Sequence, residues 1–185
     1  MIRWMVAWVL LSGGFRFDFT ELQELVAKGD WGRAHHSATD LERQLAKKAP
    51  LEVLDGQLLA GPAAGLGIYE PAANAQIRGE DIYLYAHVRN QVSRKSARGY
   101  ELFLETDLLV LDRKGEVLAE DRGFGVSRFH SRSEHRDTFV NIGVKSKGLP
   151  PGDYIFRLII HDRFGGKEGS VEIPVVMPMP QLEGG

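Results

Sequence analysis

The segment Leu149-Pro-Pro-Gly-Asp-Tyr-Ile-Phe-Arg-Leu-Ile-Ile-His-Asp162 decides the fold of this chain. Its Pro-Pro-Gly run predicts a tight turn, because proline presets one turn angle and glycine adopts angles that other residues avoid. After the turn, Tyr154, Phe156, Leu158 and Ile160 occupy every second position, so their side chains share one face. This alternation is the period of a strand and not of a helix. The segment therefore predicts a turn that leads directly into a buried strand.

Similar alternation continues along most of the chain after residue 66. The apolar runs are separated by glycine-containing turns, such as Asp112-Arg-Lys-Gly115, which is typical of a β-hairpin. Besides the segment quoted above, the runs lie in residues 66–71, 82–88, 100–110, 117–126, 140–144 and 171–175. Their number and spacing predict about seven strands in two facing sheets, a mainly β sandwich over residues 66–178.

The N-terminal part of the chain has helical rather than strand periodicity. Thr20, with Gln23 three positions later, predicts the start of a first helix. Gly29 is expected to end that helix in a left-handed conformation, and Asp30 to cap a second helix. The apolar side of the second helix would consist of Trp31, Ala34, Ala38, Leu41 and Leu45. We therefore predict an α-helical hairpin over residues 15–50.

Residues 1–14 have the pattern of a signal peptide. An apolar run follows Arg3, and the small residues Ser12-Gly13-Gly14 follow the run. The run is too short to span a bilayer, which needs about 20 residues. We expect export to the periplasm or the extracellular space, with a cytoplasmic location as the alternative. Residues 51–65 and 179–185 are predicted to be a connector and a tail.

The composition excludes several classes of function. Lys and Arg number 23 and Asp and Glu 25, which gives a formal net charge of -2. With this balance and no uninterrupted basic run, we predict no nucleic-acid partner. The absence of cysteine excludes disulfides, thiolate nucleophiles and cysteine-based metal sites.

Three turn motifs carry a resemblance to a known group of domains. They are Gly79-Glu80 before Ile82-Tyr-Leu-Tyr85, then Asp112-x-x-Gly115, and finally Leu149…Gly152-x-Tyr154 before Asp162 and Gly166-Lys167. Together they resemble bacterial extracytoplasmic immunoglobulin-like or fibronectin type III-like domains. The resemblance implies a seven-stranded immunoglobulin-like β-sandwich with a tyrosine corner, in which Leu149, Gly152 and Tyr154 are structural residues. It implies no particular activity.

A local basic cluster is the best binding candidate in the sequence. Arg94, Lys95 and Arg98 lie in a polar segment between two predicted strands, shortly after Arg89. Tyr83 and Tyr85 precede this segment on the face opposite the predicted core. Basic side chains beside aromatic rings can bind an anionic sugar, a phosphate or the acidic surface of a partner.

Patterns for catalysis or metal binding are absent from the sequence. His87 and His161 lie on predicted strands and meet only if those strands are neighbours. Residues 129–137 combine Ser, His, Glu and Asp in one polar loop, whereas nucleophilic catalysis needs such groups to converge on a rigid scaffold. No His-Glu-x-x-His spacing occurs. We predict no catalytic residue, no metal site and no cofactor.

These observations favour a non-enzymatic protein-interaction or scaffolding module of the cell envelope. Its partner would be another protein or a cell-envelope component, and no segment would span a membrane. One alternative is a carbohydrate-binding sandwich that uses exposed Tyr83 and Tyr85. Another is a hydrolase with its residues in the loop 129–137.

Overall fold

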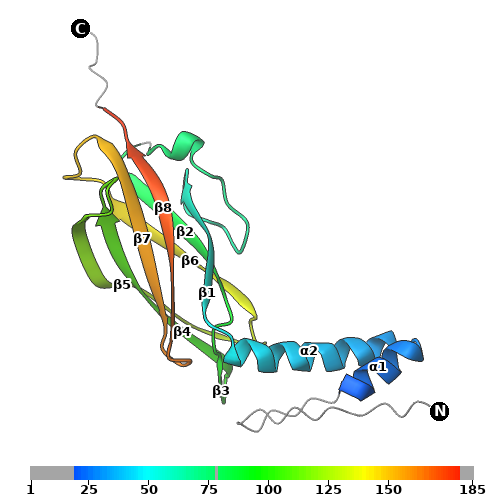
Figure 1. Cartoon of the computed structure of the whole chain (residues 1–185). Helices are drawn as coiled ribbons and strands as arrows, with labels where there is room; N and C mark the ends of the chain where they lie inside the picture. Colours follow the sequence, from blue (N-terminus) through cyan, green and yellow to red (C-terminus); the bar gives the residue numbers. More distant parts are fainter. Residues whose placement is uncertain (1–18, 78, 180–185) are drawn as a thin grey trace. The chain divides into compact units, whose positions relative to one another are not determined.

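The computed structural model describes residues 19–77 and 79–179, which are mainly β structure preceded by two helices (Figure 1). The chain divides into two compact units, residues 1–48 and 49–185. The predicted signal peptide and all but the first residue of the predicted tail lie outside the described residues. No helix in the described part of the chain has the length and apolar character needed to cross a bilayer.

The two helices form where the hairpin was predicted. Helix α1 covers Phe19–Ala27 and helix α2 covers Trp31–Lys48. Gly29 has a φ of 70°, and the Asp30 carboxylate accepts a hydrogen bond from the Arg33 N–H at 3.2 Å, as an N-cap does. Phe19, the first described residue, is already helical, so Thr20 lies inside α1 and is not its N-cap. Of the predicted apolar side of α2, only Ala34 is buried.

The β unit contains eight strands instead of the seven predicted. They are β1 (Glu52–Leu59), β2 (Asp81–Arg89), β3 (Arg94–Ser96), β4 (Gly99–Leu111), β5 (Val117–Ser131), β6 (Asp137–Lys145), β7 (Gly152–Asp162) and β8 (Lys167–Met177), with a short 3₁₀ helix η1 (Ala73–Ala75). Strand β1 lies in the predicted connector, and β3 lies in a predicted loop. The apolar run 66–71, predicted as the first strand, makes only isolated bridges.

The strands form two hydrogen-bonded antiparallel sheets. One sheet has the order β1-β2-β6. The other has the order β3-β4-β7-β8, with β5 paired to the opposite side of β4. Among the described residues, β5 pairs with β4 alone and is therefore an edge strand.

One hydrophobic core receives side chains from both sheets. Leu84 and Val88 of the three-stranded sheet and Leu104, Phe156 and Ile173 of the five-stranded sheet are completely or almost completely buried in it. Burial of each such side chain contributes about 1.5–3 kcal/mol to folding. The predicted alternation is observed on β7, where Tyr154, Phe156, Leu158 and Ile160 are buried.

The turn before β7 is closed by Tyr154. Its hydroxyl donates a hydrogen bond to the Pro150 carbonyl at 2.8 Å, which is the geometry of a tyrosine corner. Leu149 packs against the core from the same turn, and Gly152 is the first residue of the strand. The turn thus fixes the start of a strand that buries every second side chain from Tyr154 onward.

Candidate functional site

A buried carboxylate, that of Glu101, lies at the start of β4 between strands β3 and β5. Its position across the sheet follows from the register, in which Glu101 pairs with Arg94 on one side and with His130 on the other. Arg94 Nη2 donates to Glu101 Oε2 at 2.7 Å, and Arg128 Nε donates to Glu101 Oε1 at 2.8 Å. The hydrogen bonds from Arg94 and then Arg128 hold the pKa of Glu101 below its usual value of 4.5.

The two arginines are oriented by aromatic rings as well as by Glu101. The Arg94 guanidinium lies over the ring of Phe164 at 4.3 Å, and that of Arg128 lies over the ring of Phe103 at 5.1 Å. The two rings meet edge to face with their centres 6.0 Å apart. The arginine side chains nevertheless remain 58% and 53% exposed. Two positive charges share one buried negative charge, so this cluster presents excess positive charge to solvent.

Further basic side chains surround this arginine pair. Residues 91–101 and 128–136 contain six Arg or Lys residues and two Glu residues, although the whole chain has a net charge of -2. Lys95, Arg98 and Arg132 are exposed, and none of their side chains forms an ion pair within the described chain. The pairing of β3 and β5 with β4 brings the two segments together. We call the two segments the basic end.

The carboxylate of Asp162 fixes the connections that carry the arginine cluster. Asp162 is 1% exposed and accepts hydrogen bonds from the Val92 N–H at 2.7 Å, the Phe164 N–H at 3.0 Å and the Gly165 N–H at 2.9 Å. It therefore joins the segment before β3 to the turn between β7 and β8. A Cβ atom at Gly165 would overlap with Asp162 Oδ2, so only glycine fits at this position without a shift.

The structure separates the residues that the sequence grouped with Arg94. Lys95 and Arg98 lie with Arg94 at the basic end, but Arg89 lies on β2 in the other sheet. There its guanidinium forms ion pairs with Asp137 at 3.3 Å and Glu52 at 3.6 Å. Arg128 and Arg132, which sequence reasoning missed, complete the cluster. They lie near the end of β5, and only the strand pairing reveals that they are neighbours of Arg94.

The predicted exposed tyrosine pair does not exist. Tyr85 is 1% exposed, its hydroxyl accepts a hydrogen bond from the Gly67 N–H at 3.0 Å, and its ring contacts those of Tyr69 and Phe139. Burial raises the pKa of Tyr85 above its ordinary value of 10.0. Tyr83 is only partly exposed. The segment before β2 folds over this face, so the two tyrosines offer no paired platform for a sugar.

The two strand histidines also lie apart, because β2 and β7 belong to different sheets. His87 lies 3.8 Å from Asp55 and 3.7 Å from Asp137. His161 lies between Asp107, at 2.8 Å, and Glu168, at 3.1 Å. Each histidine thus has two carboxylates near it and no second histidine. Within residues 19–77 and 79–179, no group of three or more His, Asp or Glu side chains is arranged to hold a metal ion.

One serine and one histidine of the predicted polar loop do meet. Strand β5 extends to Ser131, whose hydroxyl lies 2.8 Å from His135 Nε2. The pair is exposed, and in the described chain no carboxylate hydrogen-bonds to His135 to orient its ring. A nucleophile–base pair normally needs such an orienting group. The contact therefore lacks the arrangement expected of a hydrolase.

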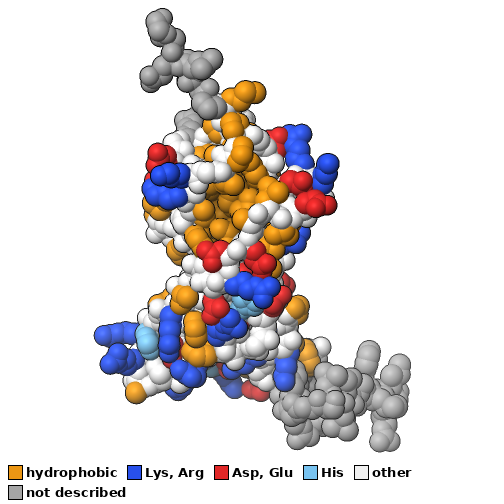
Figure 2. All heavy atoms as spheres, turned by 90° about the vertical axis from the view of Figure 1, so that its left-hand side faces the viewer, with side chains coloured by type: hydrophobic (Ala, Val, Ile, Leu, Met, Phe, Trp, Pro, Cys, Tyr) orange, Lys and Arg blue, Asp and Glu red, His pale blue; other side chains and the backbone are white. Residues whose placement is uncertain are grey.

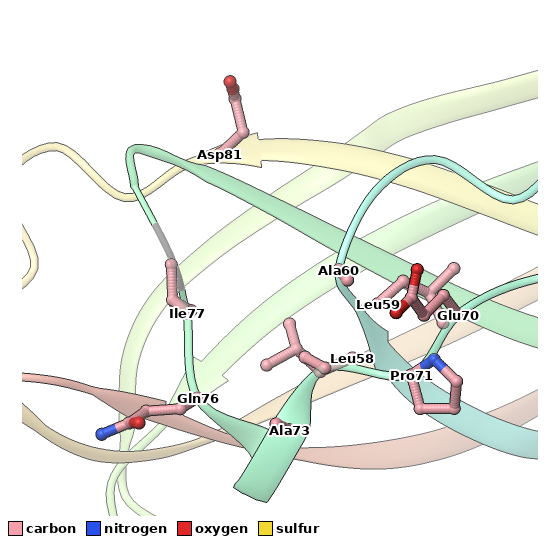
Figure 3. Close-up of a pocket in the computed structure, with 10 residues that line it drawn as sticks. Leu58, Leu59, Ala60, Glu70, Pro71, Ala73, Gln76, Ile77 and Asp81 are labelled. Atoms are coloured by element: carbon pink, nitrogen blue, oxygen red, sulfur yellow. The ribbon is translucent and has the colours of Figure 1, made fainter.

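A small cavity lies at the other end of the β unit (Figure 3). It has a volume of about 180 Å³, and Leu58 and Ile77 form part of its apolar wall. Asp81 borders the cavity, but its carboxylate is paired with Lys145 at 2.6 Å. Because small-molecule sites usually occupy about 300–1,000 Å³, this cavity has room only for a small group.

Comparisons with known proteins give likenesses of structure alone. No protein-family model matches the chain, and no curated protein matches its sequence. A DNA-bound alkylpurine DNA glycosylase, AlkC, of Pseudomonas fluorescens matches 71% of this chain with a TM-score of 0.36 and 11% identity. The match covers 31% of the glycosylase, so this chain spans about a third of that protein. A protein designated ApaA from Bordetella pertussis matches with a TM-score of 0.29 and 14% identity, over 71% of this chain and 94% of that one.

These comparisons correct two expectations. A matched structure is a DNA glycosylase bound to DNA, which conflicts with the predicted absence of a nucleic-acid partner. It also conflicts with the predicted role as a non-enzymatic protein-interaction or scaffolding module of the cell envelope. Neither expectation is retained. With TM-scores below 0.5, the two likenesses assign no function to this chain.

Proposed function

We propose that this chain binds a phosphate-rich polyanion at its basic end, and that the ligand is single-stranded nucleic acid. The observation that carries the proposal is the pair of half-exposed arginines, Arg94 and Arg128, held by one buried carboxylate. Their guanidinium groups are suited to phosphate, because each presents several N–H donors in a fixed plane. Lys95, Arg98 and Arg132 add positive charge without a partner charge in the described chain.

Exposed rings at the same end favour a single strand over a duplex. Phe129 is an exposed aromatic side chain on β5, and its ring lies edge to face with that of His135. Unpaired bases stack on such rings, while the bases of a duplex are already stacked on one another. Basic side chains interleaved with aromatic rings are the arrangement that sequence-tolerant single-strand binding uses.

We also propose that the β unit is an immunoglobulin-like β-sandwich. The sheet orders β1-β2-β6 and β5-β4-β7-β8, the shared core and the Tyr154 corner support this assignment. Strand β3 would then be a short addition beside the start of β4. In such a fold the basic end lies where several strand connections meet, as binding surfaces of these domains commonly do. The proposed role is binding, and we propose no chemical step.

Fluorescence anisotropy with a labelled single-stranded oligonucleotide tests the function. The wild-type chain should bind, and its affinity should fall with salt, with a slope of about -0.7 per contacted phosphate on a log–log plot. The double variant Lys95→Glu/Arg98→Glu should weaken binding at least tenfold. It should also reduce the slope, because fewer phosphates remain neutralised.

A matched control separates the effect of the total charge of the chain from the effect of where that charge lies. Lys114→Glu/Lys147→Glu makes the same change of net charge at exposed positions. These two positions follow the C-terminal ends of β4 and β6, whereas the basic end lies beside the first residues of both strands. This control should bind nearly as well as wild type. Equal losses in the two variants, or no binding by wild type in low salt, would overturn the proposal. Binding to a sulfated polysaccharide but not to the oligonucleotide would retain the basic end as a site and reject nucleic acid.

A further inference from the structure

The positive charges of the basic end lie on both sides of β4 at one level of the five-stranded sheet. The register places Arg94 of β3 and His130 of β5 opposite Glu101 of β4. Lys95 follows Arg94 on β3, and Arg128 lies two positions before His130 on β5. Because neighbouring strands are about 4.8 Å apart, β3 and β5 are separated by only about 10 Å. These charges therefore form a row that crosses three strands near the start of β4.

Two carboxylates lie on the same face of the sheet, farther along the strands. Side chains alternate between the two faces of a strand, so Asp107 of β4 shares the face of Glu101, which precedes it by six positions. His161 Nε2 lies 2.8 Å from Asp107 Oδ2, and its Nδ1 lies 3.1 Å from Glu168 Oε2 on β8. On the side of the molecule that carries β5, Asp and Glu side chains lie directly below an apolar area (Figure 2). The sheet face beyond the row of basic side chains is therefore acidic.

The charge of these two carboxylates is not balanced by Arg or Lys. Within the described chain, neither Asp107 nor Glu168 forms an ion pair with an Arg or Lys side chain. Glu105 lies on the same face but differs, because Arg163 Nε donates a hydrogen bond to its carboxylate at 3.1 Å. The Asp107 side chain is only 15% exposed, and water screens a partly buried charge less than an exposed one. A phosphate that followed the strands away from the basic end would therefore approach two carboxylates that repel it.

We infer that a single strand bound at the basic end crosses β3, β4 and β5, and that Asp107 and Glu168 exclude it from the rest of the sheet face. This inference rests on the proposed function and adds to it the path of the ligand. Like charges that face each other across an interface are unfavourable, so the two carboxylates disfavour any path along the strands. The six Arg and Lys residues of the basic end then set the largest number of phosphates that one chain neutralises.

Salt titrations with labelled oligonucleotides of increasing length test this limit, under conditions in which each oligonucleotide binds one copy of the chain. The slope of log affinity against log salt should stop steepening as the oligonucleotide lengthens. It should not pass about -4, because six phosphates contribute about -0.7 each. A slope that continued to steepen with length would mean that the ligand runs on over the sheet, and would overturn the inference.

Site-directed photo-cross-linking tests the path directly, because the chain contains no cysteine of its own. Ser133 lies in the basic end and Ser170 lies on β8 beyond Glu168, and both are exposed. A photoreactive label on Ser133→Cys should cross-link to a bound oligonucleotide, whereas the same label on Ser170→Cys should not. Equal cross-linking from the two positions would overturn the proposed path while leaving binding itself established. No binding by the unlabelled wild-type chain would instead reject the proposed function.

Removal of one repelling charge tests the cause of the exclusion. Glu168→Gln should raise the affinity for a long oligonucleotide by about twofold or more, because one of the two repelling charges is lost. In the Ser170→Cys background it should also allow cross-linking from residue 170. Glu172→Gln is the matched control, since Glu172 lies on the same strand and face, about 14 Å farther from the basic end. Thermal melts should show that both variants remain folded. Identical affinity and cross-linking in Glu168→Gln and Glu172→Gln would overturn the role of Glu168.

Discussion

The guanidinium of Arg94 lies 4.3 Å from the centre of the Phe164 ring, although the two residues are far apart in the sequence. Phe164 reaches this place because Asp162 anchors the turn between β7 and β8. The Phe164 ring therefore contacts one face of the Arg94 guanidinium, and the Glu101 carboxylate accepts a hydrogen bond from its Nη2. Orientation of Arg94 thus depends on two contacts that can be removed separately.

Phe164→Leu should weaken oligonucleotide binding without unfolding the chain. A cation–π contact at an exposed site contributes about 0.5–1 kcal/mol, so we expect the affinity to fall by about two- to fivefold. The free energy of unfolding should fall by a similar amount. Anisotropy and urea titration measure the two quantities. An unchanged affinity in a variant of lower stability would show that the ring supports the fold only.

Glu101→Gln should alter the response of the fold to acid. The pKa of Glu101 in the folded chain lies below the ordinary value of 4.5, because Arg94 and Arg128 donate to the charged form. Its contribution to stability is therefore present above pH 4.5 and is lost as the pH falls through the lower, folded-state pKa. The melting temperature of the wild-type chain should fall as the pH is lowered below 4.5. The melting temperature of the Glu101→Gln variant should fall less steeply over the same pH range. Parallel curves for the two proteins would contradict the prediction.

A related change at Glu105 provides a comparison at a second acidic site on the same strand. Hydrogen bonding from Arg163 lowers the pKa of Glu105 in the same direction. Glu105→Gln should therefore also flatten the acid limb of the stability curve. Because Glu105 is not part of the arginine pair, its substitution should leave the salt dependence of oligonucleotide binding unchanged.

Tyr154→Phe should destabilise the β unit and leave ligand binding intact. The substitution removes the hydrogen bond to the Pro150 carbonyl and retains the buried ring. Loss of one such bond costs about 0.5–1.5 kcal/mol. Urea unfolding measures this change directly. A variant as stable as wild type would mean that water replaces the carbonyl partner without loss.

Gly165→Ala should be far more damaging than Gly61→Ala. A Cβ atom at Gly165 would overlap with the Asp162 carboxylate, whereas nothing lies within 4 Å of a Cβ atom at Gly61. Displacement of a buried carboxylate from its donors costs several kcal/mol. We expect Gly165→Ala to lower both the melting temperature and the oligonucleotide affinity, and Gly61→Ala to change neither. Similar melting temperatures for the two variants would contradict this account.

The sequence predicted correctly those elements that are determined by residues close together in the chain. The tight turn at residues 149–152, the alternation of β7 and the left-handed Gly29 all depend on neighbours within a few positions. The Asp112 turn is of the same kind, since its carboxylate accepts hydrogen bonds from Lys114 N–H at 2.8 Å and Glu116 N–H at 2.9 Å. Such signals are readable in a single sequence.

The candidate site depended on contacts between distant segments and was predicted only in part. Arg94, Lys95 and Arg98 were visible as a short basic cluster. Arg128 joins them only through the pairing of β5 with β4, which no local pattern reveals. The burial of Tyr85 has a similar cause, because Gly67 and Tyr69 reach it from a segment whose path over the sheet is set by tertiary packing.

The three hydrogen bonds to Asp162 have a consequence for the thermodynamics of binding. They tie the segment that leads into Arg94 to the turn that carries Phe164, and they do so before any ligand arrives. The backbone at this point therefore has little conformational entropy left to lose when a polyanion binds. Affinity at the basic end should then be set by the charges and by released counterions, with only a small penalty for ordering the protein.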